Sequence, residues 1–222
     1  FTNSPHEYDT MIDSGDCLVL MGRHDEAALR FKRASEFATE PGKKNLANFK
    51  AGETYFKSSR FMQAAESFAK LIPGVKGQED LWVAGQLYHA QAIEQFDLPS
   101  AKLIYKQLAT SDDISLKEPA LIAIAALSVN DGELTQALEY YTKLIELSKE
   151  TPRDSYALGL LGRGLVELKI SRYNDALKSF EQAEQIKDGG EYSTRAAFLK
   201  AEALYSLGQE TVAYSNTVAF LE

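Results

Sequence analysis

Small and aromatic residues recur at a nearly constant spacing along the chain. Six alanines mark the repeat, and successive members stand 37, 37, 36, 39 and 37 residues apart. These alanines are Ala27, Ala64, Ala101, Ala137, Ala176 and Ala213. A period of about 20–50 residues is typical of repeat architectures, so the pattern favours an array of similar structural units.

Two further columns test this register. Four residues after each alanine, five of six positions are aromatic, although aromatic residues make up 10% of the chain: Phe31, Phe68, Tyr105, Tyr141, Phe180 and Thr217. Twelve residues before each alanine, five of six positions are glycine or alanine: Gly15, Gly52, His89, Ala125, Gly164 and Ala201. Agreement of two independent columns indicates a real repeat rather than a chance alignment of alanines.

Prolines and glycines divide each repeat into two helices. Proline is tolerated at helix starts and breaks helix interiors. Pro5 precedes the first repeat, Pro99 lies in the turn of the third, and the others lie at repeat junctions: Pro41, Pro73, Pro119 and Pro152. Gly22, Gly132 and Gly208 fall in turns within pairs. The sequence predicts no strand and twelve helices, over 6–20, 24–38, 43–57, 61–72, 78–95, 99–110, 117–130, 134–149, 153–170, 174–187, 190–207 and 211–221.

These motifs resemble tetratricopeptide (TPR) repeats over nearly the whole chain. The resemblance is strongest in three repeats, through Gly15, Ala27, Phe31 and Ala34, through Gly52, Tyr55, Phe61, Ala64 and Phe68, and through Gly164, Tyr173, Ala176, Phe180 and Ala183. The third repeat departs at His89, which leaves its register open by one residue, and the sixth carries Thr217 instead of an aromatic residue. The resemblance implies an all-α fold, a right-handed α-solenoid of about six antiparallel helix pairs. It also implies a single superhelical domain over 1–222, with repeats near 8–41, 45–77, 82–114, 118–151, 157–189 and 194–222.

Packing explains why these residue types recur. Small residues let the two helices of a pair approach closely, and each aromatic residue is expected to fill the space toward the next pair. A single pair cannot bury both of its faces, so pairs stack. In the same register Cys17 is predicted to face the interior of the first pair.

Composition excludes several classes of function. The chain has 222 residues, a net charge of −8 and a pI near 5.1, so it lacks the basic patch of a nucleic-acid binder and is unsuited to an anionic membrane surface. The chain contains no run of about 18 apolar residues, so the sequence predicts no transmembrane helix. One cysteine excludes an intrachain disulfide framework and a cysteine-rich metal site.

The first residue and the repeat spacing bear on the compartment. The first residue is Phe1, so the chain is processed or cut, and a signal peptide or anchor could have been removed upstream. The spacing of 36–39 residues exceeds the family's 34 and resembles TPR proteins of the bacterial envelope. These observations favour the bacterial cell envelope, with the cytoplasm as the alternative.

No catalytic constellation is visible in the sequence. The phosphate-binding, dinucleotide-binding, zinc-protease and nucleophile-elbow motifs are all absent. The glycine-rich run 159–164 lies inside a predicted helix, where helix packing explains it, and Ser67–Lys70 matches a serine–lysine motif too short to carry weight. The three histidines fall in different repeats or at different depths. The sequence therefore predicts a non-enzymatic protein without a cofactor or a metal.

The TPR resemblance places partner contacts on the first helix of each pair, on its concave face. Repeat positions 5, 9 and 12 there are apolar with scattered carboxylates, which suits a hydrophobic or basic peptide segment or a partner helix. The candidate contact residues are Phe49, Glu53, Phe56, Gln86, Ile93, Ile122, Val129, Leu161, Leu165, Phe198, Glu202 and Tyr205. These positions have two alternatives: simple packing in the core of a tight superhelix, or the lining of a tunnel for a small, lipid-like hydrophobic ligand.

The last segment is unusually apolar for the end of a repeat array. Residues 211–222 include Val212, Tyr214, Val218, Phe220 and Leu221, and their one charged residue is the terminal glutamate. Because a repeat array needs a polar outer face at its ends, we expect the native chain to continue beyond 222, or this end to pack against another protomer. The alternative is that the helix folds inward and uses Ser215, Asn216 and Thr217 as a polar cap.

The same register gives a first testable prediction. Chaperone-binding TPR domains hold a C-terminal carboxylate with a clamp of lysine, asparagine and arginine, which is missing here because position 9 offers Asp16 and Glu53. Titration with an acidic C-terminal chaperone-tail peptide is expected to give no saturable binding. Micromolar affinity that is abolished by amidating the peptide's carboxyl group would contradict this reading.

Overall fold

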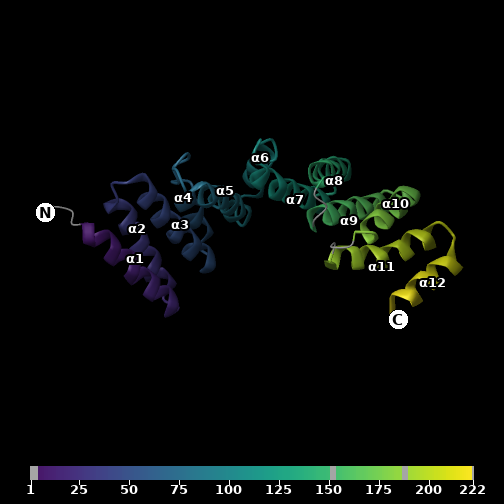
Figure 1. Cartoon of the computed structure of the whole chain (residues 1–222), viewed down its shortest axis with the longest axis horizontal. Coiled ribbons are helices and arrows are strands. Elements are labelled where there is room, and N and C mark those ends of the chain that lie inside the picture. Colours follow the sequence, from purple (N-terminus) through teal and green to yellow (C-terminus); the bar gives the residue numbers. More distant parts are fainter. Residues whose placement is uncertain (1–4, 151–153, 187–189, 222) are drawn as a thin grey trace. The chain divides into compact units, whose positions relative to one another are not determined.

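The residues that the structure describes fold into twelve α-helices (Figure 1). The computed structural model describes residues 5–150, 154–186 and 190–221, and over these residues it contains no β-strand. The all-α prediction is therefore confirmed. The helices are α1 (Pro5–Leu20), α2 (His24–Phe37), α3 (Pro41–Lys57), α4 (Phe61–Phe68), α5 (Glu79–Glu94), α6 (Leu98–Leu108), α7 (Ile114–Asn130), α8 (Leu134–Ser148), α9 (Asp154–Lys169), α10 (Tyr173–Glu184), α11 (Gly190–Ser206) and α12 (Glu210–Leu221).

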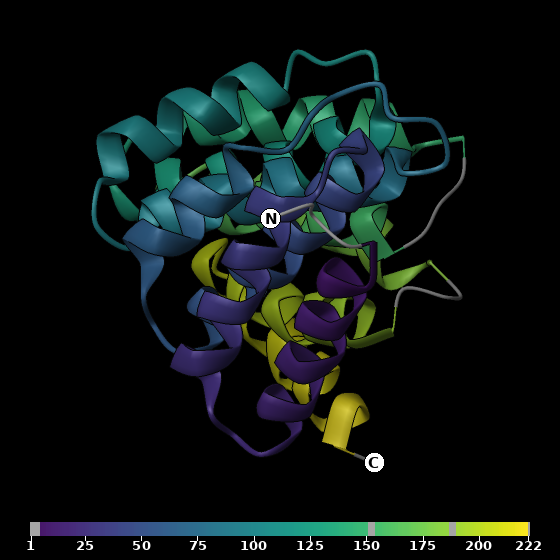
Figure 2. The same ribbon diagram turned by 90° about the vertical axis from the view of Figure 1, so that its left-hand side faces the viewer.

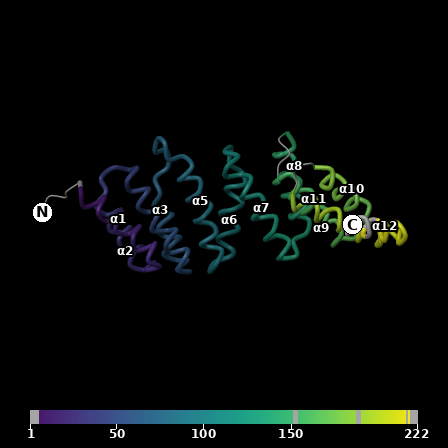
Figure 3. Tube along the Cα trace, turned by 60° about the horizontal axis from the view of Figure 1, so that its bottom comes forward, coloured from purple at the N-terminus to yellow at the C-terminus, as the bar shows by residue number. Residues whose placement is uncertain are grey.

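The helices form two compact units, Phe1–Leu108 and Ala109–Glu222. Each unit stacks three helix pairs, and the two helices of each pair run antiparallel across their three-residue turn. Figure 3 follows the chain through these helices. In the first unit, α1 and α2 lie side by side and are joined by their turn (Figure 2). The single continuous domain expected from the sequence stays a prediction.

All six pairs share one connection length. Three residues separate the two helices of every pair, and in five pairs the middle residue has a positive φ. The predicted turn glycines Gly22, Gly132 and Gly208 are confirmed in this conformation, with φ between 73° and 78°. Ser59 and Ser171 occupy the same position with φ of 59° and 61°, although the left-handed region costs a residue with a side chain about 1–2 kcal/mol.

The turn of the third pair is built differently. Phe96 is its middle residue and is not among the residues of positive φ. Instead, the Asp97 N–H donates to the Ile93 carbonyl at 2.8 Å, and the Asp97 side chain accepts from the Ser100 N–H at 3.2 Å. This side-chain cap starts α6 beside Pro99, the residue that the sequence placed in this turn.

Among the predicted helix boundaries, the end of α4 differs most, by four residues. The helix predicted over 61–72 ends at Phe68, because the chain then enters a loop anchored by the buried side chain of Asn45. The Asn45 Nδ2 donates to the Ile72 carbonyl at 2.9 Å, and the Ile72 N–H donates to Asn45 Oδ1 at 2.8 Å. This pair of hydrogen bonds replaces those that another turn of helix would have made.

The seventh helix begins three residues earlier than predicted. Asp113 caps it by accepting from the Ser115 N–H at 2.9 Å, so α7 starts at Ile114 and contains Pro119. The placement of Pro119 at a repeat junction was therefore wrong. The N-cap at Asp113, six residues upstream, outweighed the usual position of proline at the first helical residue.

The glycine and aromatic columns of the sequence meet inside the pairs. A Cβ atom built on Gly15 would lie 2.4 Å from the Phe31 ring, and one on Gly52 would lie 2.7 Å from the Phe68 ring. Gly164 has the same relation to Phe180, at 2.6 Å. Each ring therefore rests directly on the first helix of its own pair, at a position that no larger residue could occupy without displacement.

The aromatic residues also reach the next pair, as the sequence predicted. The Phe68 ring stacks on the Tyr88 ring of α5 with 5.5 Å between centroids. Phe31 belongs to one core cluster with Ala51 and Tyr55 of α3. One side chain thus fixes both the spacing within a pair and the contact between pairs.

Cys17 does not face the interior of the first pair. Its side chain is exposed, so that prediction was wrong. At 3.6 residues per turn, Cys17 is about 200° around the helix from the buried Gly15, on the side away from α2.

The close contact at Gly164 gives the second prediction. Gly164→Ala is expected to lower the free energy of unfolding by up to about 2 kcal/mol, because overpacking against Phe180 costs roughly 1–3 kcal/mol and the gain in helix propensity returns about 1 kcal/mol. Chemical denaturation measures the change. In a Phe180→Leu background the same substitution is expected to be neutral or stabilising, and a stabilising Gly164→Ala in the native background would show that the contact is not tight.

Candidate functional site

The predicted contact residues of the first unit lie mainly in packing between pairs. Phe49, Phe56 and Ile93 are partly buried against the cluster that includes Phe68. The Tyr88 ring of α5 lies edge-on to Phe49 and Phe56, with centroids 6.1 and 5.8 Å apart. Phe49 and Phe56 are therefore covered by the next first helix rather than left open.

The second unit repeats this arrangement. Ile122 and Val129 of α7 pack against the cluster that contains Val166 of α9. Leu161 is only 2% exposed, and Leu165 packs against the cluster of α9, α10 and α11. Side chains at repeat positions 5 and 12 thus pack in the core wherever the following first helix belongs to the same unit. This is the packing alternative that the sequence left open.

The predicted polar contact residues of the first unit are less enclosed. Glu53 and Gln86 are half-buried. Asp16, at the repeat position of Glu53, accepts two hydrogen bonds from Lys50 Nζ, at 2.7 and 3.0 Å. This ion pair joins α1 to α3 and occupies one of the carboxylates that the sequence offered to a basic partner.

The last pair brings three predicted contact residues together at an open surface. Phe198 is 51% exposed, Tyr205 is 65% exposed, and Glu202 is exposed. They lie in a groove of about 500 Å³ between α11 and α12, the pair nearest the C-terminus in Figure 1. We call this surface the α11–α12 groove, and it is lined by Phe198, Ala201, Glu202, Tyr205, Glu210, Ala213, Tyr214 and Thr217.

The chemistry of the α11–α12 groove is aromatic and acidic. Tyr214 is 73% exposed and adds a second tyrosine from α12, and the groove's two charged residues are the exposed Glu202 and Glu210. Such a lining offers apolar area, phenolic hydroxyls and negative charge, and the described lining residues include no basic group.

Sequence reasoning missed Glu210 and did not connect Tyr214 with the contact face. Both lie on a second helix, whereas the TPR resemblance directs attention to first helices. The sequence had marked Tyr214 and Val212 only as part of an apolar terminal segment, and both are exposed. Val218, Phe220 and Leu221 lie outside the residues whose side chains the structure describes, so the expectation for that end stays a prediction.

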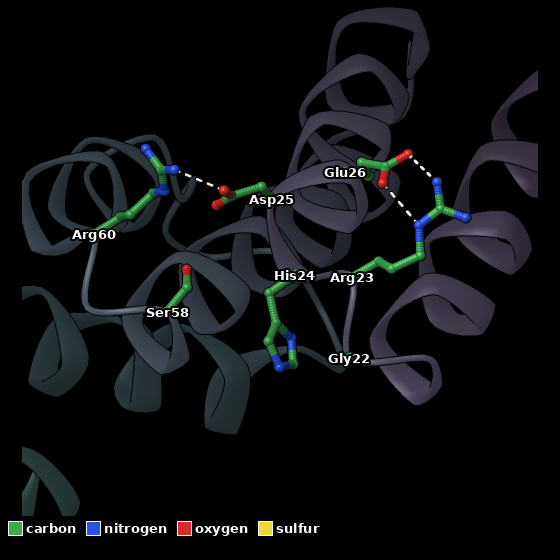
Figure 4. Close-up of a pocket in the computed structure, with 7 residues that line it drawn as sticks. All are labelled: Gly22, Arg23, His24, Asp25, Glu26, Ser58 and Arg60. Atoms are coloured by element: carbon green, nitrogen blue, oxygen red, sulfur yellow. Dashed lines mark hydrogen bonds and ion pairs between the residues drawn. The ribbon is translucent and has the colours of Figure 1, made fainter.

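A second pocket, of about 410 Å³, lies at the turns of the first two pairs (Figure 4). Its charged groups are engaged with one another: Arg60 binds Asp25 at 2.6 Å, and Arg23 Nε donates to Glu26 at 2.7 Å. His24 points away from both ion pairs, as the close-up shows (Figure 4). Its buried Nδ1 has no hydrogen-bond partner among the described residues. The polar groups diverge, so they do not form a common ligand site.

The third pocket, of about 590 Å³, lies beside α8 and α9 and is lined by residues that include Arg163 and Glu167. The buried Ser179 donates to Glu167 Oε2 at 2.6 Å and accepts from Arg163 Nε at 3.0 Å. Burial raises the pKa of the Glu167 carboxyl above its ordinary value, although Ser179 and Arg163 act in the opposite direction. This network satisfies buried polar groups between α9 and α10 and leaves no accessible nucleophile at Ser179.

The described residues contain neither a cluster that could bind a metal ion nor a helix that could span a membrane. Across residues 5–150, 154–186 and 190–221, no three histidine, cysteine or acidic side chains are grouped so that they could hold a metal ion. In the same ranges, none of the helices has both the length and the apolar character to cross a membrane.

Comparison with known proteins identifies the fold. No protein-family model and no curated protein matches the chain. Crystal structures match it: apo RapI has a TM-score of 0.74 at 17% identity over 97% of this chain, and a tetratricopeptide repeat protein from Parabacteroides merdae has 0.64 at 14% identity, with 95% of this chain and 77% of that one covered. YrrB, described as a TPR protein with an unusual peptide-binding site, has a TM-score of 0.55 at 15% identity, with 84% and 89% covered.

These likenesses show a TPR-like repeat fold, as the sequence motifs predicted. The chain spans 63% of the length of RapI. TPR-like folds generally mediate the binding of proteins or peptides and are typically non-catalytic.

The Glu167 network gives the third prediction. Because the folded state raises the pKa of this carboxyl, the folded protein binds more protons than the unfolded one, and stability falls as the pH rises from the carboxyl's ordinary range toward neutrality. Glu167→Gln keeps an acceptor for Ser179 and is expected to remove that part of the decline. Urea unfolding at a series of pH values measures it.

The control for this prediction is Glu139→Gln. Glu139 lines the same pocket but is exposed, so its replacement should leave the pH dependence of the wild type in place. Parallel curves for the wild type and Glu167→Gln would show that this carboxyl is not linked to folding.

Proposed function

We propose that this TPR-like protein is a non-enzymatic binding module that holds a protein or peptide segment, with the α11–α12 groove as its contact surface. The observation that carries the proposal is the exposure of Phe198, Tyr205 and Tyr214 around one open groove. Contiguous exposed apolar surface on a soluble domain typically marks an interaction site.

The residue types in the groove support recognition of a macromolecule. Tyrosine is enriched among the side chains that dominate binding energy, since it contributes a large apolar area with few rotatable bonds. Covering apolar surface stabilises a complex by about 25 cal/mol per Å² before the costs of association. Tyr205 and Tyr214 stand on different helices, so a bound segment could contact both walls of the groove.

The fold also supports the binding of a peptide. YrrB has a similar fold and is described as having a peptide-binding site, which provides a precedent for peptide recognition by such an array. In the pocket around His24, the charged groups are paired with one another. In the pocket beside α8 and α9, Arg163 and Glu167 are engaged with the buried Ser179.

The proposal gives the fourth prediction. Peptides are selected from a displayed random library against the full chain, and binding is then measured with a Tyr205→Ala, Tyr214→Ala variant. Loss of both rings is expected to weaken binding at least about tenfold, since residues of this kind often contribute 2 kcal/mol or more.

The matched control is Leu103→Ala, because Leu103 is also strongly exposed and apolar but lies on α6, outside the groove. This variant is expected to bind like the wild type. Selected peptides that bind the Tyr205, Tyr214 variant as well as the wild type would move the site elsewhere. A library that yields no binder, together with a lipid retained in native mass spectrometry, would favour a small hydrophobic ligand instead.

A further inference from the structure

The α11–α12 groove has an internal counterpart between α3 and α4. All eight of its lining residues have an equivalent 149 residues earlier in the repeat register. Five of the equivalents are identical or similar: Phe198 and Phe49, Ala201 and Gly52, Glu202 and Glu53, Tyr205 and Phe56, Ala213 and Ala64. The protein therefore contains a second groove of the same construction.

In the earlier groove the occupant is visible, and it is a helix. α5 lies on α3 and α4 and places Tyr88 among three aromatic rings. The Tyr88 ring stacks on Phe68 with an interplanar angle of 13° and meets Phe49 and Phe56 edge-on. The packing of α5 thus shows that a groove of this kind accepts a helix with an aromatic side chain.

The last groove differs from the earlier one in ways that suit an aromatic side chain. Thr217 stands where Phe68 forms the floor, so the centre of the last groove is lined by a smaller residue. Tyr214 replaces the buried Ala65 and adds an exposed ring at the wall. In the earlier groove the ring of Tyr88 contacts Phe68. In the last groove an incoming aromatic ring would contact Tyr214 instead.

The charge at one end of the groove also differs. Glu210 replaces Phe61, which packs on Phe56 in the earlier pair with centroids 5.3 Å apart. Together with Glu202 it places two exposed carboxylates near the turn between α11 and α12. A ligand that carries positive charge at this end would complement them.

The charges disfavour a second copy of the chain as the occupant. If α1 of another copy entered the groove, its exposed residues would include Asp9 and Asp13. Two copies joined through their last pairs would bring Glu202 and Glu210 against the same acids. Like charges brought together in an interface oppose both arrangements.

We infer that the α11–α12 groove accepts an amphipathic α-helix of a partner protein, aligned with α11 as α5 is aligned with α3. The helix carries an aromatic residue in the place of Tyr88 and lysine or arginine one and two turns after it, toward Glu202 and Glu210. This inference rests on the binding function proposed above and specifies the class of partner.

The chain supplies a probe for the test. We use helix-stabilised peptides with the sequence of residues 79–95, in which Gln91 and Gln95 are exposed in the parent structure. The basic probe carries Gln91→Arg and Gln95→Arg, the acidic probe carries Gln91→Glu and Gln95→Glu, and a third is the basic probe with Tyr88→Ala. Binding to the full chain is measured by fluorescence anisotropy at low salt.

The basic probe is expected to bind at least about tenfold more tightly than the acidic probe and than the Tyr88→Ala probe. Raising the salt concentration should reduce the charge preference, because ions screen exposed charges. In a Glu202→Lys, Glu210→Lys variant the order of the basic and acidic probes should reverse. Reversal of charge preference is a readout that misfolding of the variant would not produce.

Three outcomes would overturn the inference. One is equal affinity of the basic and acidic probes. Another is tight binding of the basic probe that Tyr205→Ala leaves unchanged, which would place a binding site elsewhere and leave the proposed binding function standing. The third is occupation of the groove by this protein itself. Concentration-dependent dimerisation of the wild type that Tyr205→Ala abolishes would assign the groove to a second copy, and loss of probe binding in a natural chain that extends beyond 222 would assign it to the segment that follows. Failure of the library selection, in contrast, would count against the binding function itself.

Discussion

The absence of a Cβ atom at a few helix positions is the constraint on which the packing of these pairs depends. Phe31, Phe68 and Phe180 each lie against a glycine of the neighbouring helix, at distances that a methyl group would violate. Because protein interiors are close-packed, such a contact fixes the distance between two helices rather than merely permitting it. The same rings then extend into the contact with the next pair, so one steric condition propagates along each unit.

This coupling also explains where a binding surface can arise. A first helix with an apolar face next to its partner helix forms a groove, and inside a unit that groove is filled by the following first helix. The residues that would bind a foreign segment and the residues that stack the array are therefore of the same types at the same repeat positions. Phe56 and Tyr205 illustrate this, since one packs against Tyr88 and the other is largely exposed.

Much of the fold could be predicted from the sequence, because the interactions that set it are local and periodic. Glycine, alanine and aromatic residues at fixed offsets determined the twelve helices and their pairing. The end of α4 could not be predicted, since it depends on Asn45, a residue distant in sequence from Ile72. For the candidate site, periodicity identified Phe198 and Tyr205 but could not separate them from Phe49 and Leu161, because the cover over a position is set by the next helix rather than by the residue itself.

The serines at the turns have a consequence for how such a chain can change over generations. Ser59 and Ser171 hold a conformation that glycine would hold more easily, and both belong to pairs whose packing glycine, Gly52 or Gly164, meets a phenylalanine. Turn glycines are thus exchangeable at modest cost, whereas packing glycines are tied to the ring they meet. Mutational drift can then erase much of a repeat's recognisable signature while its geometry persists, which is how structures at 12–17% identity can share this architecture.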